Sequence, residues 1–189
     1  MKLVSTSMAD GQPLNGKFAF CIPAAEGHVA ISSNTNPHLA WSDVAEGTRS
    51  LVLICHDPDV PSRGDDVNQE GRTVPASLPR VDFFHWVLVD LDPARGEIRE
   101  GEFSSEVTAR GKAGPSAPHA TRQGINDYTG WFAGDADMAG DYYGYDGPCP
   151  PWNDEIKHHY VFTLFATDLN SLPIEGRFSG QQVRDAIEG

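Results

Sequence analysis

Four stretches of the chain are strongly apolar and rich in Val, Ile, Phe and Thr, and clusters of Gly, Pro and Asp separate them. This composition favours β-strands. Residues 51–54 and 87–89 are apolar without alternation, so we expect both faces of those strands to be covered. The pattern predicts a mainly β fold in which two sheets pack as a sandwich. The expected strands are residues 17–22, 49–55, 83–91 and 160–167.

A different pattern occurs near the end of the chain. Ser179 begins the sequence Ser-Gly-Gln-Gln, so Gln182 stands where a capping box requires it. Val183, Ala186 and Ile187 then follow at helical spacing. We therefore predict a short C-terminal helix that packs on the sandwich.

Two long segments, residues 62–82 and 104–142, show no sustained period and carry much of the Gly, Pro and charge. Loops of this length in a compact domain tend to be functional. We expect them to flank a site rather than to join domains. A chain of 189 residues can bury one substantial core, so we interpret residues 1–189 as a single domain.

Charge narrows the choice of partners. The chain has 27 acidic and 14 basic residues, a formal net charge of -13, which repels nucleic-acid phosphates and anionic membrane surfaces. No apolar run approaches the ~18 residues that span a bilayer, and the first residues lack a signal-peptide core. We predict a cytoplasmic protein that binds no nucleic acid and does not insert stably into membranes.

The three cysteines, Cys21, Cys55 and Cys149, show no CxxC spacing and cannot all pair within one chain. This disfavours a disulfide scaffold and a structural zinc site, so we expect reduced thiols. Cys149 lies between prolines, and we expect it to be a packing thiol rather than a nucleophile.

Polar and ionisable residues stand at the ends of the apolar runs. Residues 55–61 read Cys-His-Asp-Pro-Asp-Val-Pro, residues 84–86 read Phe-His-Trp, and residues 147–151 read Gly-Pro-Cys-Pro-Pro, with His-His-Tyr at 158–160. Partly desolvated His and Asp side chains must be hydrogen-bonded, paired or functional. One shared pocket would satisfy all of them.

Strand alternation limits which of these side chains can meet. His158 and Tyr160 should point to one face and His159 to the other. The same rule places His85 and Trp86 on opposite faces unless a bulge intervenes.

These motifs resemble the phosphatidylethanolamine-binding protein family, in particular its bacterial branch described as Raf kinase inhibitor-like. The matching stretches are residues 57–63, His85-Trp86, residues 147–151 with 158–160, and Asn-Pro-His-Leu-Ala-Trp at 36–41. Four ordered motifs over residues 15–170 are specific where one would be weak.

The resemblance implies a β-sandwich with a small pocket for phosphate-like anions, and no cofactor. Because some relatives inhibit kinases, it also implies a regulatory protein partner, while bacterial relatives suggest a homodimer. The ligand-binding positions that it implies are Asp57, Asp59, His85, Gly147, Pro148, His158 and Tyr160.

The residue types support these roles. Histidines can donate N–H groups to an oxyanion, Tyr160 offers a hydroxyl, and a glycine lets the backbone amide near Gly147 approach closely. Asp57 would repel phosphate unless it orients a histidine and raises its pKa, the role that we favour, or receives a cationic part of the ligand.

We hypothesise a ligand such as phosphoethanolamine, whose ammonium group Asp57 could accept. If His85 or His158 must be protonated, binding should weaken as the pH rises through ~6.5 to 7.5.

Two other function classes remain open. A metal hydrolase could use His56, Asp57, Asp59, His85 and His158 as ligands. No HExxH spacing and no Gly-x-Ser-x-Gly elbow supports catalysis, so we expect a binding protein rather than an enzyme. The long loops could also dock a partner through a phosphorylated residue.

Overall fold

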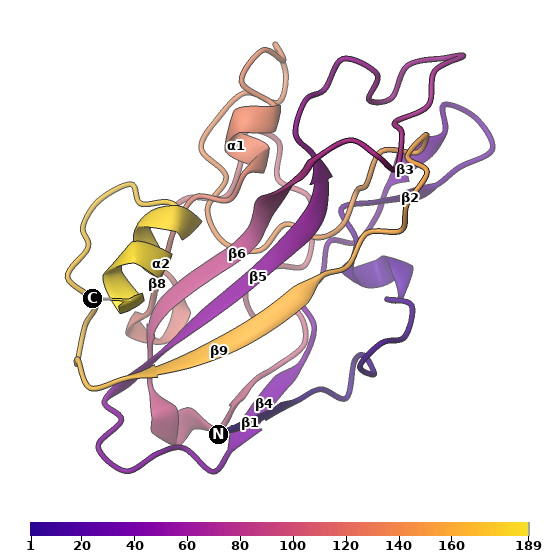
Figure 1. Cartoon of the computed structure of the whole chain (residues 1–189). Helices are drawn as coiled ribbons and strands as arrows, with labels where there is room; N and C mark the ends of the chain where they lie inside the picture. The colour runs from indigo at the N-terminus through magenta and orange to yellow at the C-terminus, as the bar shows by residue number, and fades with distance from the viewer. Residues whose placement is uncertain (189) are drawn as a thin grey trace.

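Within residues 1–188, which the structure describes, the strands of this computed structural model form three antiparallel sheets (Figure 1). The largest has the order β8 (Arg122–Gln123), β6 (Arg80–Leu91), β5 (Ser50–Pro61) and β9 (Val161–Thr167). The second has the order β1 (Lys2–Val4), β4 (Leu39–Ser42) and β7 (Glu97–Ile98). The third is the hairpin of β2 (Cys21–Pro23) and β3 (Val29–Ile31).

The first two sheets pack face to face. Leu53 and Trp86 from the large sheet meet Leu39 and Ile98 from the three-stranded sheet in one core cluster, and each of these side chains is fully or almost fully buried. The predicted sandwich of two packed sheets is therefore confirmed.

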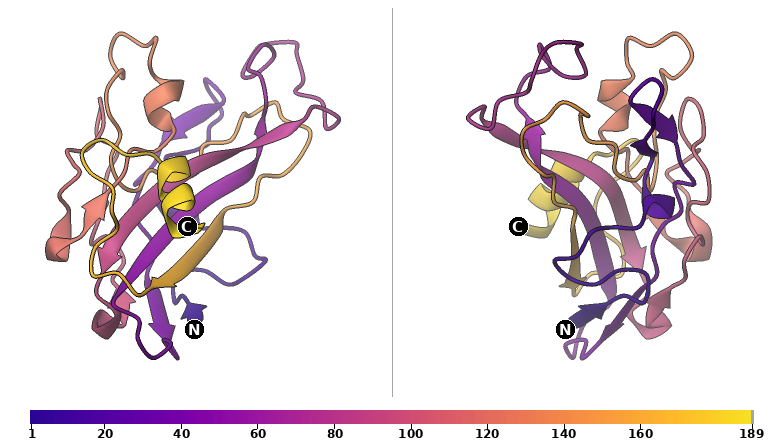
Figure 2. Two further views of the ribbon diagram at one scale, coloured as in Figure 1. Left: turned by 60° about the vertical axis from the view of Figure 1, so that its left-hand side comes forward. Right: turned by 90° about the vertical axis from the view of Figure 1, so that its right-hand side faces the viewer.

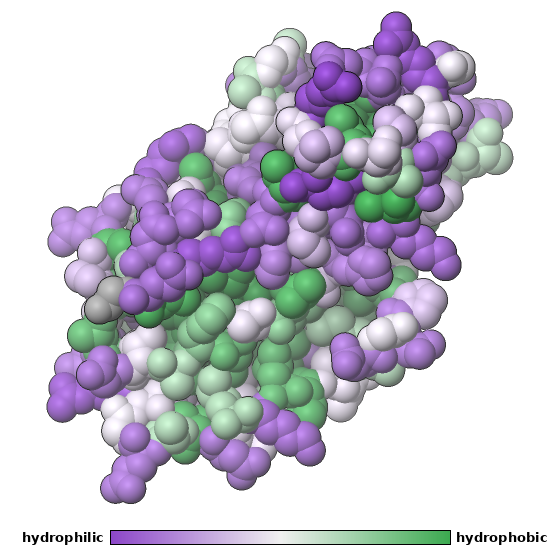
Figure 3. Space-filling view, viewed as in Figure 1, coloured by the Kyte–Doolittle hydropathy of each residue, from purple (hydrophilic) through white to green (hydrophobic). Residues whose placement is uncertain are grey.

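The opposite face of the large sheet is covered in part by α2 (Gly180–Glu188), as the turned views show (Figure 2). Val52 and Val87 pack there with Val183 of the helix. This accounts for the continuous apolar runs of β5 and β6, because both of their faces are buried. Beyond α2, an apolar band follows β9 across the same face (Figure 3).

The C-terminal helix begins as its capping box predicts. The amide of Ser179 donates to Oε1 of Gln182 at 2.9 Å, and the amide of Gln182 donates to Oγ of Ser179 at 3.3 Å. Two of the backbone donors that a helix start leaves free are thus satisfied.

The predicted strand at residues 17–22 is wrong in its first half. Asn15 accepts a hydrogen bond from the amide of Lys17 and starts the 3-10 turn η1 (Gly16–Phe18), so that β2 begins only at Cys21. Asparagine favours such local turns over an extended strand.

The two long segments also contain more structure than expected. Residues 104–142 include η3 (Pro118–Ala120), strand β8 and α1 (Tyr128–Trp131), while η2 (Pro93–Arg95) follows β6. Strand β6 begins at Arg80, inside the other segment. Among residues 1–188, none of the helices has both the length and the apolar composition needed to cross a bilayer.

The expectation of reduced thiols is wrong for two of the three cysteines. Cys21 of β2 and Cys149 form a disulfide with their Cα atoms 5.0 Å apart, although 128 positions separate them in the chain. Cys149 is thus neither a nucleophile nor a packing thiol. Cys55 is a buried free thiol in the core, so the odd number of cysteines left room for one bridge.

Candidate functional site

A β-bulge in β6 places His85 at the site. Cys55 of β5 pairs with Trp86, whereas the next residue, His56, pairs with Phe84, so His85 is an extra residue in its strand. A bulge re-aims the side chains around it. The ring of His85 consequently contacts Tyr160, which packs on the same core as Trp86. Without this bulge, His85 and Trp86 would point to opposite faces of the sheet.

Asp57 lies opposite Phe83 of β6 and is only 2% exposed. Its Oδ1 accepts a hydrogen bond from the amide of Asp59 at 2.8 Å, and its Oδ2 lies 2.6 Å from Nδ1 of His158. This is the contact that the orienting role requires. The same geometry offers an ammonium group little access to the carboxylate.

His158 is held between two carboxylates. Its Nδ1 faces Asp57, and its Nε2 lies 3.1 Å from Oδ2 of Asp154. Burial opposes protonation of this ring, but the hydrogen bonds and charges of Asp57 and Asp154 outweigh it and raise the pKa of His158. Ionised carboxylates only accept hydrogen bonds, so these two contacts favour the form of the ring in which both nitrogens carry a proton. Neither N–H group is left to bind an anion directly.

Arg80 extends this arrangement. Its guanidinium makes two hydrogen bonds to Asp154, at 2.5 and 3.0 Å. Burial tends to raise the pKa of Asp154, but the hydrogen bond from Arg80 and those from Ile156 and His158 lower it overall. We call the series Asp57, His158, Asp154 and Arg80 the charge chain. Its two acids and two cations cancel, so it presents no surplus positive charge.

His85 is 3% exposed, and its Nδ1 lies 2.7 Å from the carbonyl oxygen of Asp146. A carbonyl can only accept, so Nδ1 carries the proton. Burial lowers the pKa of His85 to about 4, although the carbonyl groups of Asp146 and Gly147 act in the opposite direction. The ring is therefore neutral near pH 7, and the version of the binding hypothesis that needs a protonated His85 is not favoured. With the proton on Nδ1, Nε2 is the acceptor nitrogen of the ring.

Tyr160 supplies the complementary group. Its hydroxyl is buried and has no hydrogen-bond partner in the described part of the chain. Burial and the charge of Asp57 raise its pKa, so the hydroxyl keeps its proton. The rings of Tyr160 and His85 meet edge to face, with centroids 5.3 Å apart. A hydroxyl without a hydrogen-bond partner in the described residues and a ring with an acceptor nitrogen thus belong to two side chains in contact.

Gly147 has a structural role that differs from the expected one. A Cβ atom at this position would lie 2.0 Å from the carbonyl oxygen of Phe18, so the close approach of two backbone segments requires glycine. Its amide donates to Oδ1 of Asn34 at 2.8 Å and is not available to a ligand in this arrangement. The carbonyl of Pro148 likewise accepts from the amide of Phe20 at 2.9 Å.

A buried polar network behind Gly147 was missed by the sequence analysis. Asp146 accepts hydrogen bonds from Lys112 at 2.8 Å, from Asn34 at 2.7 Å and from Asn126 at 2.8 Å. Burial raises the pKa of Asp146, and the ammonium of Lys112 opposes that rise. The network fixes the backbone carbonyl that orients His85. In the sequence, Asp146 stands directly before the Gly147-Pro148 motif, and this position could have marked it as part of the site.

Asp59 and His56, which the sequence analysis named as candidate site residues, lie outside this cluster. Oδ2 of Asp59 accepts from Nδ1 of His159 at 2.7 Å, and the side chain of His159 is 75% exposed. The predicted alternation of His158 and His159 is therefore confirmed, and Asp59 belongs to the surface pair. His56 points to the α2 face, where its ring lies near Phe84 and Asp82.

The metal-ligand set of the hydrolase alternative is consequently divided between two faces of the sheet. Among residues 1–188, no group of three or more His, Cys, Asp or Glu side chains is arranged to hold a metal ion.

Comparison with known proteins supports the motifs. The family model described as phosphatidylethanolamine-binding protein matches residues 4–189. The UPF0098 protein YbhB of Escherichia coli is 30% identical over 183 residues, which cover 97% of this chain and 88% of that protein. A UPF0098 protein of Chlamydia muridarum is 30% identical over 189 residues, covering 100% and 90%.

Solved structures of two bacterial proteins have a similar fold. The crystal structure of YbcL from E. coli, described as a new member of the mammalian PEBP family, superimposes with a TM-score of 0.66 at 24% identity, covering 99% of this chain and 88% of that one. The homologue CT736 of Chlamydia trachomatis gives a TM-score of 0.62 at 26% identity, covering 99% and 87%. These relatives are bacterial, as the motifs indicated. The chain therefore belongs to the phosphatidylethanolamine-binding protein family.

Proposed function

We propose that this protein binds a small phosphate-type anion that carries a single negative charge and one remaining proton. The observation that supports the proposal is the buried hydroxyl of Tyr160, which has no hydrogen-bond partner among residues 1–188, beside the ring of His85, whose Nε2 is the acceptor nitrogen. The hydroxyl would donate to an anionic oxygen. The imidazole nitrogen would accept the proton of the P–OH group.

The charge chain favours a singly charged ligand. His158 and Arg80 are already paired with Asp57 and Asp154, so a dianion would find no spare cation to offset its second charge. Burying an unpaired charge is costly, whereas a monoanion held by hydrogen bonds loses less solvation free energy. Affinity should therefore fall as the pH rises through the second pKa of phosphate, about 6 for a phosphomonoester.

Calorimetry with inorganic phosphate, at several values between pH 5 and 8, tests the proposal. Tyr160→Phe removes the donor, and a charge-assisted hydrogen bond of about 1.5 to 3 kcal/mol corresponds to a loss of roughly 10- to 100-fold in affinity. The unliganded variant should be as stable as the wild type, because the hydroxyl has no partner to lose.

Tyr145→Phe is the matched control. The hydroxyl of Tyr145 donates to the carbonyl of Phe18, so this variant should lose stability and keep its affinity for phosphate. Equal binding by wild type and Tyr160→Phe would remove the basis of the proposal. Phosphoethanolamine should bind no more tightly than a phosphomonoester without an ammonium group, because Asp57 is almost fully buried.

The predicted location and partners stay predictions. Disulfides persist mainly in oxidising compartments, so the Cys21–Cys149 bridge weighs against a cytoplasmic location. Cell fractionation combined with thiol labelling would decide between the cytoplasm and an oxidising compartment.

Regulation of a kinase or another protein through the anion site would require that phosphate and the partner compete. A binding assay with added phosphate measures this competition.

A further inference from the structure

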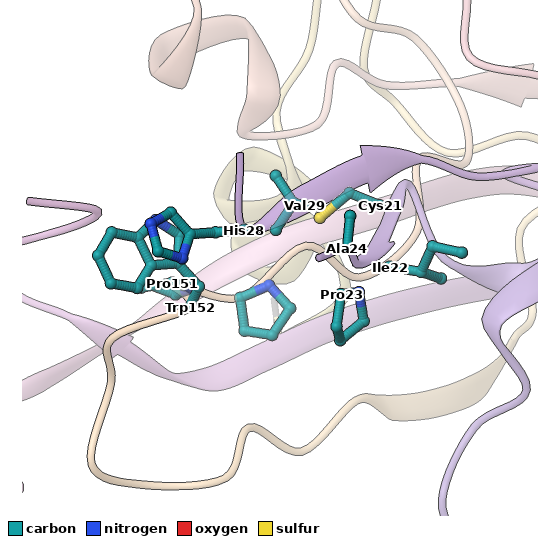
Figure 4. A pocket seen from close by; sticks show the side chains of 9 residues that line it. Cys21, Ile22, Pro23, Ala24, His28, Val29, Pro151 and Trp152 are labelled. Atoms are coloured by element: carbon teal, nitrogen blue, oxygen red, sulfur yellow. The ribbon is translucent and has the colours of Figure 1, made fainter. Parts of the chain in front are cut away.

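A cavity of about 300 Å³ lies between the β2–β3 hairpin and residues 150–152 (Figure 4). Ile22, Pro23 and Val29 form the hairpin side. Pro150 and Trp152 form the other. We call this cavity the hairpin groove. Its volume is at the lower end of the range for small-molecule sites.

Flat rings dominate the walls of the hairpin groove. At one end the imidazole of His28 stacks on the indole of Trp152, with the ring centroids 3.7 Å apart and the planes 7° from parallel. Glu70 holds His28 in place, its Oε1 lying 2.6 Å from Nε2. The pyrrolidine ring of Pro23 lines the hairpin side (Figure 4), and that of Pro150 lines the opposite side. Such a surface suits a planar group better than a flexible chain.

One segment of the chain connects the hairpin groove to the anion site. Residues 147–152 run from the wall behind His85 directly into the groove, and three residues span at most about 10 Å. The Cys21–Cys149 disulfide and the hydrogen bond from the amide of Phe20 to Pro148 attach the hairpin to this same segment. One wall of the anion site and one wall of the groove thus belong to the same short, cross-linked segment.

We propose that the hairpin groove takes an uncharged planar aromatic group, and that the ligand of this protein is an aromatic compound bearing the anionic group. The second half of this inference rests on the proposed function. Glu70, which contacts His28 at the end of the groove, disfavours a further anion there, and the volume of the groove fits a ring system but not a pair of acyl chains.

Indole, which carries no anion, tests the groove alone. Titration followed by NMR should shift the methyl signals of Ile22 and Val29 in the wild type. Trp152→Ala should abolish these shifts. Val29→Ser, a change at a position that is 38% exposed and therefore compatible with folding, should weaken the shift of the Ile22 methyl signals. Trp131→Ala, at an exposed tryptophan outside the groove, should leave them unchanged. Absence of methyl shifts at millimolar indole would overturn the assignment of the groove.

Phenyl phosphate, hexyl phosphate and inorganic phosphate then test the link to the anion site by calorimetry. We expect phenyl phosphate to bind at least tenfold more tightly than inorganic phosphate, and more tightly than hexyl phosphate. Trp152→Ala should bring phenyl phosphate to the level of inorganic phosphate. Equal affinity of phenyl and inorganic phosphate for the wild type would refute the link while leaving the anion site intact. Failure of inorganic phosphate to bind would instead refute the proposed function.

Discussion

At the scale of single residues, the positions of protons determine what the site can do. Both N–H groups of His158 are used by carboxylates, whereas His85 keeps one proton on the nitrogen that faces a carbonyl. The two histidines therefore have opposite properties although both are buried. The contacts of His158 favour its charged form, whereas burial keeps His85 neutral. Sequence patterns cannot distinguish these states, because they depend on which oxygen each nitrogen meets.

His85 should make the fold sensitive to acid. Its pKa is about 4 in the folded chain and near 6.5 when unfolded. Between these values the unfolded chain binds more protons, so the free energy of unfolding should fall as the pH drops from 6.5 to 4, by about 3 kcal/mol in total.

Chemical denaturation of the wild type and of His85→Asn at pH 7 and pH 4.5 measures this contribution. Other groups titrate in the same pH range. The relevant quantity is therefore the difference in the free energy of unfolding between the wild type and His85→Asn. That difference should shrink on acidification, because the asparagine has no proton to gain. A constant difference would contradict the assignment of a neutral buried ring.

Asp57→Asn should be strongly destabilising. It removes one partner of the His158 imidazolium, and an uncompensated buried charge costs about 3 to 5 kcal/mol. NMR titration should show the pKa of His158 falling relative to the wild type, because the Asp57 carboxylate is one of the groups that raise it. The matched control is Asp59→Asn, whose partner His159 is exposed, and which should change stability by no more than about 1 kcal/mol.

At the scale of elements, the sequence predicts the helices and strands that depend on a pattern within their own residues. The C-terminal helix follows from Ser179 and Gln182, and the long strands follow from their apolar runs. The bulge at His85 leaves no such signal, since it depends on how β5 and β6 pair. The family motifs correctly indicated the cluster of Asp57, His85 and His158. They did not reveal the charge chain, because Arg80 and Asp154 meet only in three dimensions.

At the scale of the whole molecule, the disulfide connects the first part of the chain to the wall of the site. The bond closes a loop of 128 positions. Counting cysteines could not predict it, because an odd number is compatible with one bridge and one buried thiol. The net charge of -13 belongs to the same scale, and its field repels polyanions such as nucleic acids.

Loss of the bridge should lower the stability of the entire fold. Replacing Cys21 and Cys149 together by serine should cost about 2 to 5 kcal/mol, because the unfolded chain gains freedom when a long loop is opened. Thermal unfolding with and without a dithiol reductant checks this expectation. The reductant should bring the wild type to the melting temperature of the double variant and should not affect the variant itself. An equal response of both proteins would show that no such bridge contributes.

The extra residue in β6 implies that the sheet and the binding chemistry can be separated. A shortened chain lacking His85 would pair Phe84 and Trp86 with His56 and Cys55 as neighbours in one uninterrupted ladder. Such a deletion, normally ruinous inside a central strand, should here yield a folded protein with its hydrophobic interior intact and no affinity for phosphate. In that sense the scaffold is complete without its most important imidazole, which occupies a surplus position in the strand.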